Sequence, residues 1–312
     1  MQYLMLTLVA LLLAGFFAIN KLYQKKFGTS LEKSMLFVCL SGAFMTVEFF
    51  IKTGFNVRYT PFSLIASASA NLCEVIYTVI GFRLLKEGTM SAYTVFLMSG
   101  GMLLPFVFGI CFLNEKAELL KIIGLVFILA GVVLSGTNGN KKEKIKFRHI
   151  LLCCTVFIVN GFVSIISKVH QTQTVYAVSD TDSYIVFGSF FKFVLGGVIY
   201  LFIRLRNKFK KTVIGEKTTD ALPETSCDNK TKKPVVLTMI LIVLASTVAG
   251  GLSGMLMLIG AKSLPASVLY PFSTSGTIIF SSIFGAVFYK EQITPKMVAS
   301  VVACLIGTLL FL

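Results

Sequence analysis

The chain has 312 residues, of which 55% are hydrophobic and only 14% are charged. An average globular domain is about 25% charged, so this chain has too few charged side chains to cover a water-soluble surface. That composition excludes a soluble enzyme, a nucleic-acid-binding protein and a disordered chain. The net charge of +15 is not a nucleic-acid footprint, because the basic residues stand in the gaps between apolar blocks, where cationic residues of membrane proteins are found.

Ten apolar segments follow one another along the chain, and most approach the roughly 20 residues that a helix needs to cross a bilayer. Each is expected to be a helix, because lipid cannot satisfy the hydrogen bonds of an open backbone. The predicted segments are 3–19, 34–52, 61–83, 89–113, 118–136, 149–168, 182–203, 234–261, 265–289 and 295–312. The first lacks the basic leader of a signal peptide, so it is interpreted as a retained span.

The second half of the chain repeats the first. Shifted by 176 residues, 86–134 matches 262–310 at thirteen of 49 positions, with Lys, Gly and Glu in register. The sequence therefore predicts a five-helix repeat over 1–136, a linker over 137–148 and a second five-helix repeat over 149–312, the last with a mobile polar loop at 204–233. Since five is odd, the second repeat enters the membrane inverted. Inverted repeats are typical of secondary transporters.

Orientation is predicted from the distribution of Lys and Arg. The loops that follow the odd-numbered helices carry 22 of the 29 basic residues, whereas the loops that follow the even-numbered helices carry six. By the positive-inside rule the first set is cytoplasmic, which places both termini outside.

Two matching stretches carry a family resemblance. The segment 108–115 (FGICFLNE), followed by Gly131, and the segment 284–291 (FGAVFYKE), followed by Gly307, stand at equivalent places in the two repeats. The duplicated pair resembles the signature of EamA-type proteins in the drug/metabolite transporter superfamily. The resemblance implies ten helices in two inverted repeats around a central cavity, export of amino acids, metabolites or drugs, and termini inside, opposite to the charge distribution. The Trp that the family often has in the first helix of each repeat is missing, and Asn160 stands at one of those positions.

Two ionisable residues lie near the centres of predicted helices. Glu74 stands one turn from Asn71 in 61–83, and Lys192 stands in 182–203. An ionised side chain at mid-membrane costs roughly 2.5–3.5 kcal/mol on insertion scales and usually faces a cavity or a partner. Two interpretations stay open. Lys192 binds an anionic group of a substrate while Glu74 binds a cationic group or a coupling proton, or else the two form a structural pair.

A polar stripe on 265–289 indicates a second group of candidates. Its residues recur at i, i+3, i+4 and i+7, which places them on one face of a helix. We expect this face to line a cavity, although such hydroxyls can also bond back to their own helix. The predicted substrate-binding residues are Glu74, Lys192, Asn71, Asn160, Tyr93, Tyr270, Ser273, Thr274 and Thr277, with Glu74 as the possible proton-coupling site.

Other polar residues are interpreted as structural. Glu48 and Lys52, four residues apart, are expected to form a local ion pair. Glu115 is expected to favour the start of the helix 118–136 through the helix dipole, and Thr294 to cap the helix after it. His170 is expected in the solvated membrane interface.

The combined prediction is an all-α integral membrane protein of the plasma membrane that exports a small organic solute by alternating access. Its partners are that solute and the lipid bilayer, with no nucleic acid, no cofactor and no metal site. The alternatives are a non-transporting scaffold or lipid scramblase and, less favoured, an intramembrane lipid-processing enzyme. The enzyme would need clustered acid, base or nucleophilic side chains, and the two histidines are remote in sequence from both helical glutamates.

Overall fold

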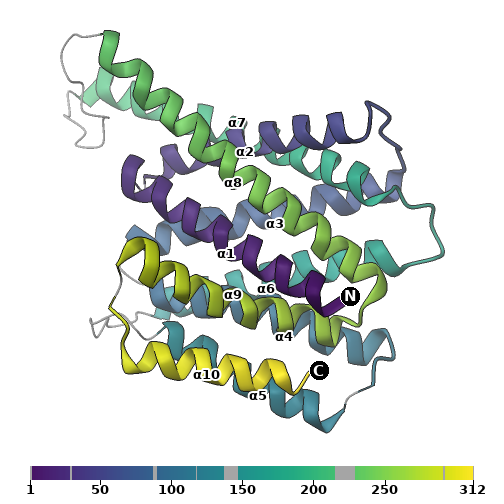
Figure 1. Cartoon of the computed structure of the whole chain (residues 1–312). Helices are drawn as coiled ribbons and strands as arrows, with labels where there is room; N and C mark the ends of the chain where they lie inside the picture. The colour runs from purple at the N-terminus through teal and green to yellow at the C-terminus, as the bar shows by residue number, and fades with distance from the viewer. Residues whose placement is uncertain are drawn as a thin grey trace.

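The computed structural model describes residues 2–28, 30–86, 90–116, 118–136, 147–214, 229–290 and 292–311. These residues form ten α-helices and no strand (Figure 1). The helices are α1 (Gln2–Phe27), α2 (Leu31–Lys52), α3 (Pro61–Lys86), α4 (Met90–Phe112), α5 (Leu119–Gly136), α6 (Phe147–Thr172), α7 (Thr181–Ile214), α8 (Asn229–Ser263), α9 (Ala266–Tyr289) and α10 (Pro295–Leu309). The all-α prediction is therefore confirmed for the described chain.

Seven of the helices, counted over the residues that are described, are long and apolar enough to cross a membrane: α1, α2, α3, α6, α7, α8 and α9. The apolar parts of the other three are shorter, and α10 has 15 residues. At 1.5 Å per residue, α10 is about 22 Å long, less than the roughly 30 Å hydrocarbon core. This set of helices is compatible with a multi-pass membrane protein.

The polar segment between α7 and α8 is more helical than predicted. The helix α7 continues to Ile214 and α8 begins at Asn229, so both ends of the expected loop 204–233 are helical. Lys and Arg are good helix formers, and a helix that leaves the bilayer can continue into water. Figure 1 shows these two helix ends extending beyond the rest of the bundle. The middle of this loop and residues 137–146 of the predicted linker lie outside the described residues.

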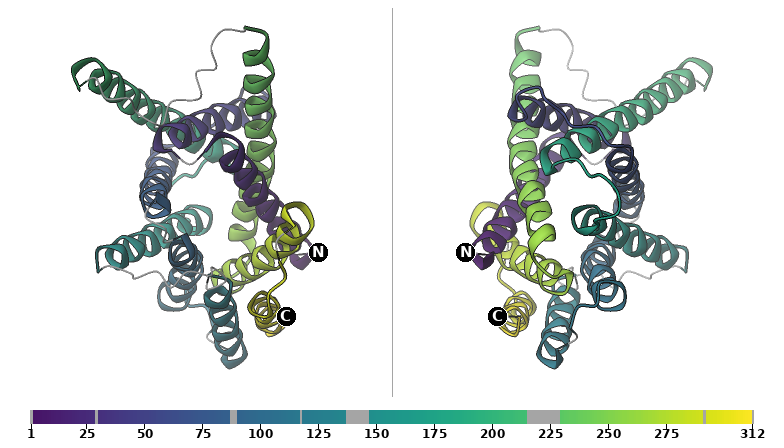
Figure 2. Two further views of the ribbon diagram at one scale, coloured as in Figure 1. Left: turned by 90° about the vertical axis from the view of Figure 1, so that its left-hand side faces the viewer. Right: turned by 90° about the vertical axis from the view of Figure 1, so that its right-hand side faces the viewer.

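The helices of the two predicted halves interleave. The helix α1 packs against α8 and α9, while α6 packs against α3 and α4. The other extensive contacts between the halves pair α2 with α7, α3 with α7, α4 with α9 and α5 with α10. Figure 2 looks roughly along the bundle and places α5 and α10 together at one edge. The halves therefore share packed interfaces throughout the described chain rather than forming two separate domains.

Close backbone approach joins α5 to α10. A Cβ atom added at Gly131 would lie 2.5 Å from Cys304 Sγ and 2.9 Å from the carbonyl oxygen of Ser300. On the other side of the crossing, a Cβ atom at Gly307 would lie 2.7 Å from the carbonyl oxygen of Gly124. The Ser300 hydroxyl also donates a 2.7 Å hydrogen bond to the Gly131 carbonyl. Small residues thus allow the two helices to touch, as they do in membrane helix pairs generally.

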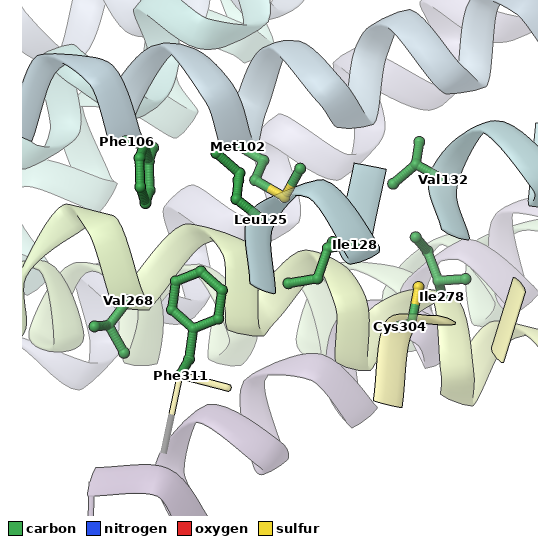
Figure 3. Packing of buried hydrophobic residues seen from close by; sticks show 9 residues of the cluster. All are labelled: Met102, Phe106, Leu125, Ile128, Val132, Val268, Ile278, Cys304 and Phe311. Carbon is green, nitrogen blue, oxygen red and sulfur yellow. The ribbon is translucent and has the colours of Figure 1, made fainter. Parts of the chain in front are cut away.

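A buried apolar cluster surrounds this crossing. Its residues come from α4, α5, α9, α10 and the residues that follow α10 (Figure 3). They are Met102, Phe106, Leu125, Ile128, Val132, Val268, Ile278, Cys304 and Phe311. This cluster attaches the edge pair α5 and α10 to α4 and α9.

We expect the Gly131→Ala change to destabilise the protein by about 1–3 kcal/mol, the usual cost of an added group in a packed interior. The new methyl group would have to displace Cys304 or the backbone of Ser300. The matched control is Gly254→Ala in α8, where a Cβ atom would meet nothing within 4 Å, so Ala should be neutral or slightly stabilising. Thermal unfolding in detergent measures both, and an equal shift for the two variants would contradict the close approach.

The ends of α4 and α9 have the same backbone conformation. Asn114 and Lys290 both have a φ of 52°, the left-handed conformation common at helix C-termini. They stand 176 residues apart, the spacing of the sequence repeat. The predicted cap of α10 is confirmed, because the Thr294 side chain accepts a 3.2 Å hydrogen bond from the Met297 amide and Pro295 follows it.

Candidate functional site

Glu74 and Lys192, the two ionisable residues predicted at mid-helix, form an ion pair. Lys192 Nζ on α7 donates to Glu74 Oε1 on α3 across 2.5 Å. The side chains are 13% exposed for Lys192 and 29% exposed for Glu74. The pair is therefore close and only partly enclosed by protein, and its charges cancel. This geometry can serve either interpretation, since a structural pair and a ligand site can use the same two groups.

Asn71 lies on the same side of α3 and faces α7. Its Nδ2 atom donates a 2.9 Å hydrogen bond to the Ser67 carbonyl. A Cβ atom at Gly188 of α7 would lie 2.4 Å from Nδ2. Glycine at this position thus makes room for the amide between the two helices. The structure places Asn71 in the α3–α7 interface, one turn from the Glu74–Lys192 ion pair.

Asn160 lies in the α4–α6 interface instead. Its Nδ2 atom donates a 2.7 Å hydrogen bond to the Leu97 carbonyl, and it occupies the space where a side chain at Gly101 would stand. An interhelical hydrogen bond is a common role for an amide side chain within a membrane helix. The side chain of Tyr93, another predicted site residue, lies outside the described residues.

The polar stripe of α9 is buried in protein. Tyr270 is 4% exposed and its hydroxyl donates a 2.7 Å hydrogen bond to the Ser164 carbonyl of α6. Thr277 donates to the carbonyl of Ser273, one turn back, across 2.7 Å. Thr274 is half-buried. The stripe faces other helices, and the hydroxyls of Tyr270 and Thr277 already have protein partners. That this face lines a cavity stays a prediction.

Replacing Thr277 by Val tests whether the stripe binds a ligand. Val has nearly the shape of Thr, and the lost hydroxyl only bonds back to its own helix, so we expect the free energy of unfolding to change by less than about 1 kcal/mol. Ligand-induced thermal stabilisation, measured on wild type and variant, gives the functional result. Loss of that stabilisation in a protein of unchanged stability would assign Thr277 to the binding site, whereas a large loss of stability would assign it to packing.

Glu115 binds the start of a different helix from the one predicted. Its two carboxylate oxygens accept hydrogen bonds from the amides of Ala266 at 2.6 Å and Ser267 at 2.9 Å, at the N-terminus of α9. Gly109 makes this possible, because a Cβ atom there would lie 2.6 Å from Glu115 Oε2. The helix-dipole argument was correct in kind. It named the helix that follows in the chain, α5, because sequence order alone shows no other helix start nearby.

Lys168 makes the complementary interaction at the end of α8. It is 4% exposed, and its Nζ atom donates to the carbonyls of Ala261 at 2.8 Å and Leu264 at 2.5 Å. A cation near the C-terminus of a helix is electrostatically favourable. The turn between α8 and α9 is therefore held by Lys168 of α6 on one side and by Glu115 on the other.

His170 is buried, contrary to the expectation of a solvated interface. It is 1% exposed, its Nε2 atom lies 2.7 Å from the Ser63 hydroxyl, and its ring stacks on Phe62. The Ser63 hydroxyl also accepts the Ser179 amide at 2.8 Å. This cluster joins α3, α6 and the segment before α7. The position of His170 at the end of an apolar segment suggested that it is exposed. In the structure, residues distant in the chain cover it.

The predicted local ion pair between Glu48 and Lys52 is wrong. Lys52 binds Asp182 at the start of α7, with Nζ and Oδ1 2.7 Å apart. The Oε2 atom of Glu48 is buried and has no hydrogen-bond partner. Helical spacing brought Lys52 within reach of Glu48, but the antiparallel packing of α2 on α7 offers it a second carboxylate.

The geometry defines an all-α fold of apolar helices with one partly enclosed ion pair between α3 and α7. Neither a protein-family model nor a curated protein matches the sequence. Solved structures do match the fold. One chain, described as the crystal structure of a protein, has a TM-score of 0.70 at 13% sequence identity, over 98% of this chain and 95% of that chain. The arrangement of the helices along the whole chain therefore occurs in a protein of very different sequence.

Proposed function

We propose that this chain is a secondary transporter, built from two inverted repeats, that moves a small organic solute across the plasma membrane by alternating access. The observation that carries the proposal is the symmetry of the helix packing. Exchanging α1–α5 with α6–α10 turns the contacts of α1 with α8 and α9 into the contacts of α6 with α3 and α4. The pairs α2 with α7, α4 with α9 and α5 with α10 exchange into themselves.

Details of single residues support the same exchange. At the α5–α10 crossing, Gly131 approaches Ser300 while Gly307 approaches Gly124, and each of these contacts becomes the other under the 176-residue shift. The shared left-handed ends of α4 and α9 follow the same rule. Two halves of equivalent structure and opposite orientation can exchange conformations, which supplies an outward-open and an inward-open state of similar energy.

The proposed solute site contains the Glu74–Lys192 ion pair and Asn71, between α3 and α7. Intramembrane charges mark solute or ion pathways by default, and both charged side chains keep part of their surface exposed. The resemblance of 108–115 and 284–291 to EamA-type proteins favours export of an amino acid, metabolite or drug. The distribution of Lys and Arg favours termini outside.

The first experiment measures thermal stabilisation of the purified protein by amino acids, nucleobases, polyamines and cationic drugs. A ligand at about 100 times its dissociation constant should stabilise by roughly 2.7 kcal/mol. A compound that stabilises the protein is then tested for uptake by proteoliposomes. The variant Lys192→Gln should lose both signals, whereas the matched Lys121→Gln, which breaks the exposed pair with Glu118, should keep them.

Absence of any stabilising compound, with no flux in proteoliposomes, would contradict the transporter. The scaffold and the lipid scramblase would then be the competing functions, and a fluorescent-lipid assay on the same proteoliposomes separates them. Retained transport in Lys192→Gln would instead support the transporter and show that its solute site does not depend on the α3–α7 ion pair.

A further inference from the structure

Glu48 is a half-buried acid that the proposed solute site does not use. It lies on α2, and its Oε2 atom is enclosed by protein without a hydrogen-bond partner. Among the buried side-chain atoms without a partner in the described chain, it is the one that belongs to a carboxyl group. A charge on this oxygen is costly, because no hydrogen-bond donor compensates it.

The surroundings of Glu48 are apolar. A Cβ atom added at Gly251 of α8 would lie 3.5 Å from Glu48 Oε2, 3.0 Å from the Phe49 ring and 3.7 Å from the Met45 methyl group. The stretch of α8 that passes here, 248–255, contains no charged residue. The carboxyl oxygen therefore faces glycine backbone and hydrophobic side chains.

The charged groups on the helices around Glu48 have other partners. On α2, Lys52 is bound to Asp182 of α7. Further along α7, Lys192 is bound to Glu74 of α3. Within the described residues, Glu48 Oε2 has no hydrogen-bond partner. The ionised form of Glu48 thus has no ion-pair or hydrogen-bond partner at this oxygen, while the neutral acid needs no counter-charge.

We propose that Glu48 is a proton-binding site within the membrane. Its protonation depends on whether Lys52 is bound to Asp182 or to Glu48. While Lys52 is bound to Asp182, Glu48 holds its proton. When Lys52 leaves Asp182 and turns to Glu48, four residues back on the same helix, the carboxyl group releases its proton to water and becomes the carboxylate partner of Lys52. Asp182, whose side chain is 28% exposed, is then solvated.

This site differs from Glu74, which is paired with Lys192. Proton binding at Glu48 does not depend on the proposed function. Its role as the coupling ion of a transporter does. Because α2 contacts α7 and α8, exchange of Lys52 between Asp182 and Glu48 changes what connects α2 to α7. Proton release is in this way linked to relative movement of two helices.

Labelling with dicyclohexylcarbodiimide tests the proton directly. The reagent takes a protonated carboxyl group: the acid O–H adds across one C=N bond, and the O-acylisourea rearranges to a stable N-acylurea that peptide mass spectrometry locates. On the full-length protein we expect Glu48 to be labelled at pH 6 and Glu74 not. Labelling of Glu48 should fall at least several-fold in Asp182→Asn, because Lys52 is then free to bind Glu48, and no adduct should form at position 48 in Glu48→Gln.

The variant Lys192→Gln is the positive control for access, since it removes the cation from Glu74 and should allow its labelling. Labelled Glu74 in that variant with unlabelled Glu48 overturns the proposal, as does equal labelling of Glu48 in wild type and Asp182→Asn. If the reagent reaches neither acid, the infrared band of a protonated carboxyl group decides. That band is expected in wild type and reduced in Glu48→Gln, and its equality in the two overturns the proposal. Labelled Glu48 in a protein without transport would preserve the proton site and reject the transporter.

Discussion

Replacing Glu74 or Lys192 alone is expected to destabilise the protein more than replacing both together. A single change, Glu74→Gln or Lys192→Gln, leaves one charge between α3 and α7 without its partner. Breaking a buried pair costs roughly 3–5 kcal/mol. The side chains here are 13% and 29% exposed, so we expect about 2 kcal/mol for each single variant. The double variant removes both charges and should recover much of that loss.

Thermal unfolding of the four proteins in one detergent measures this double-mutant cycle. Transport in proteoliposomes gives a second result from the same samples. A double variant that regains stability but transports nothing assigns the pair a direct role with the solute. A double variant that regains both assigns it a structural role, and single variants as stable as wild type would contradict the ion pair itself.

The second large effect is expected from Glu115→Gln. Glu115 accepts hydrogen bonds from the amides of Ala266 and Ser267. Gln keeps one accepting oxygen but loses the second and the negative charge that favours the start of α9. Hydrogen bonds to charged groups contribute about 1.5–3 kcal/mol, and a charge at a helix N-terminus contributes up to about 2 kcal/mol. We therefore expect a loss of about 2 kcal/mol in stability, seen as a lower unfolding temperature.

Glu118→Gln is the matched control, because it makes the same chemical change three residues further along the chain. Glu118 is 56% exposed and pairs with Lys121, and exposed pairs contribute about 0–1 kcal/mol. The two variants should therefore differ clearly in unfolding temperature. Equal shifts would mean that the carboxylate of Glu115 does not hold the α8–α9 turn.

Glu74 and Glu115 show how far the sequence alone can predict the role of a charged residue. The mid-helix position of Glu74 and Lys192 was enough to select both as candidates, since a charge within an apolar segment requires a partner or a cavity. That they bind each other depends on the packing of α3 against α7. Glu115 shows the opposite case, because its helix-terminal role was predicted while its partner, 151 residues away, was not.

Glu48 and Lys52 show why helical spacing by itself misleads. Residues four apart on a helix can always meet, so the local pair was a reasonable prediction. The crossing of α2 and α7 brings Asp182 within 2.7 Å of Lys52. The helix α8 covers the Oε2 atom of Glu48 instead. A charged side chain pairs with the opposite charge that lies closest in space. Helical spacing reveals only the carboxyl group on the same helix and not the one on a neighbouring helix.

The sequence by itself determined that the chain is helical and apolar enough for a bilayer, roughly where most of the helices begin and end, and that its two halves share a pattern. Those properties are local: hydrophobicity, backbone hydrogen bonding and capping act within a few residues of each position. Tertiary structure alone decided which helices interleave, that the stripe on α9 faces protein, and which partner each of Glu48, Lys52, Glu115 and Lys168 has or lacks. Electrostatic and packing energies depend on distances between atoms, and neighbouring helices set those distances whatever their separation along the chain.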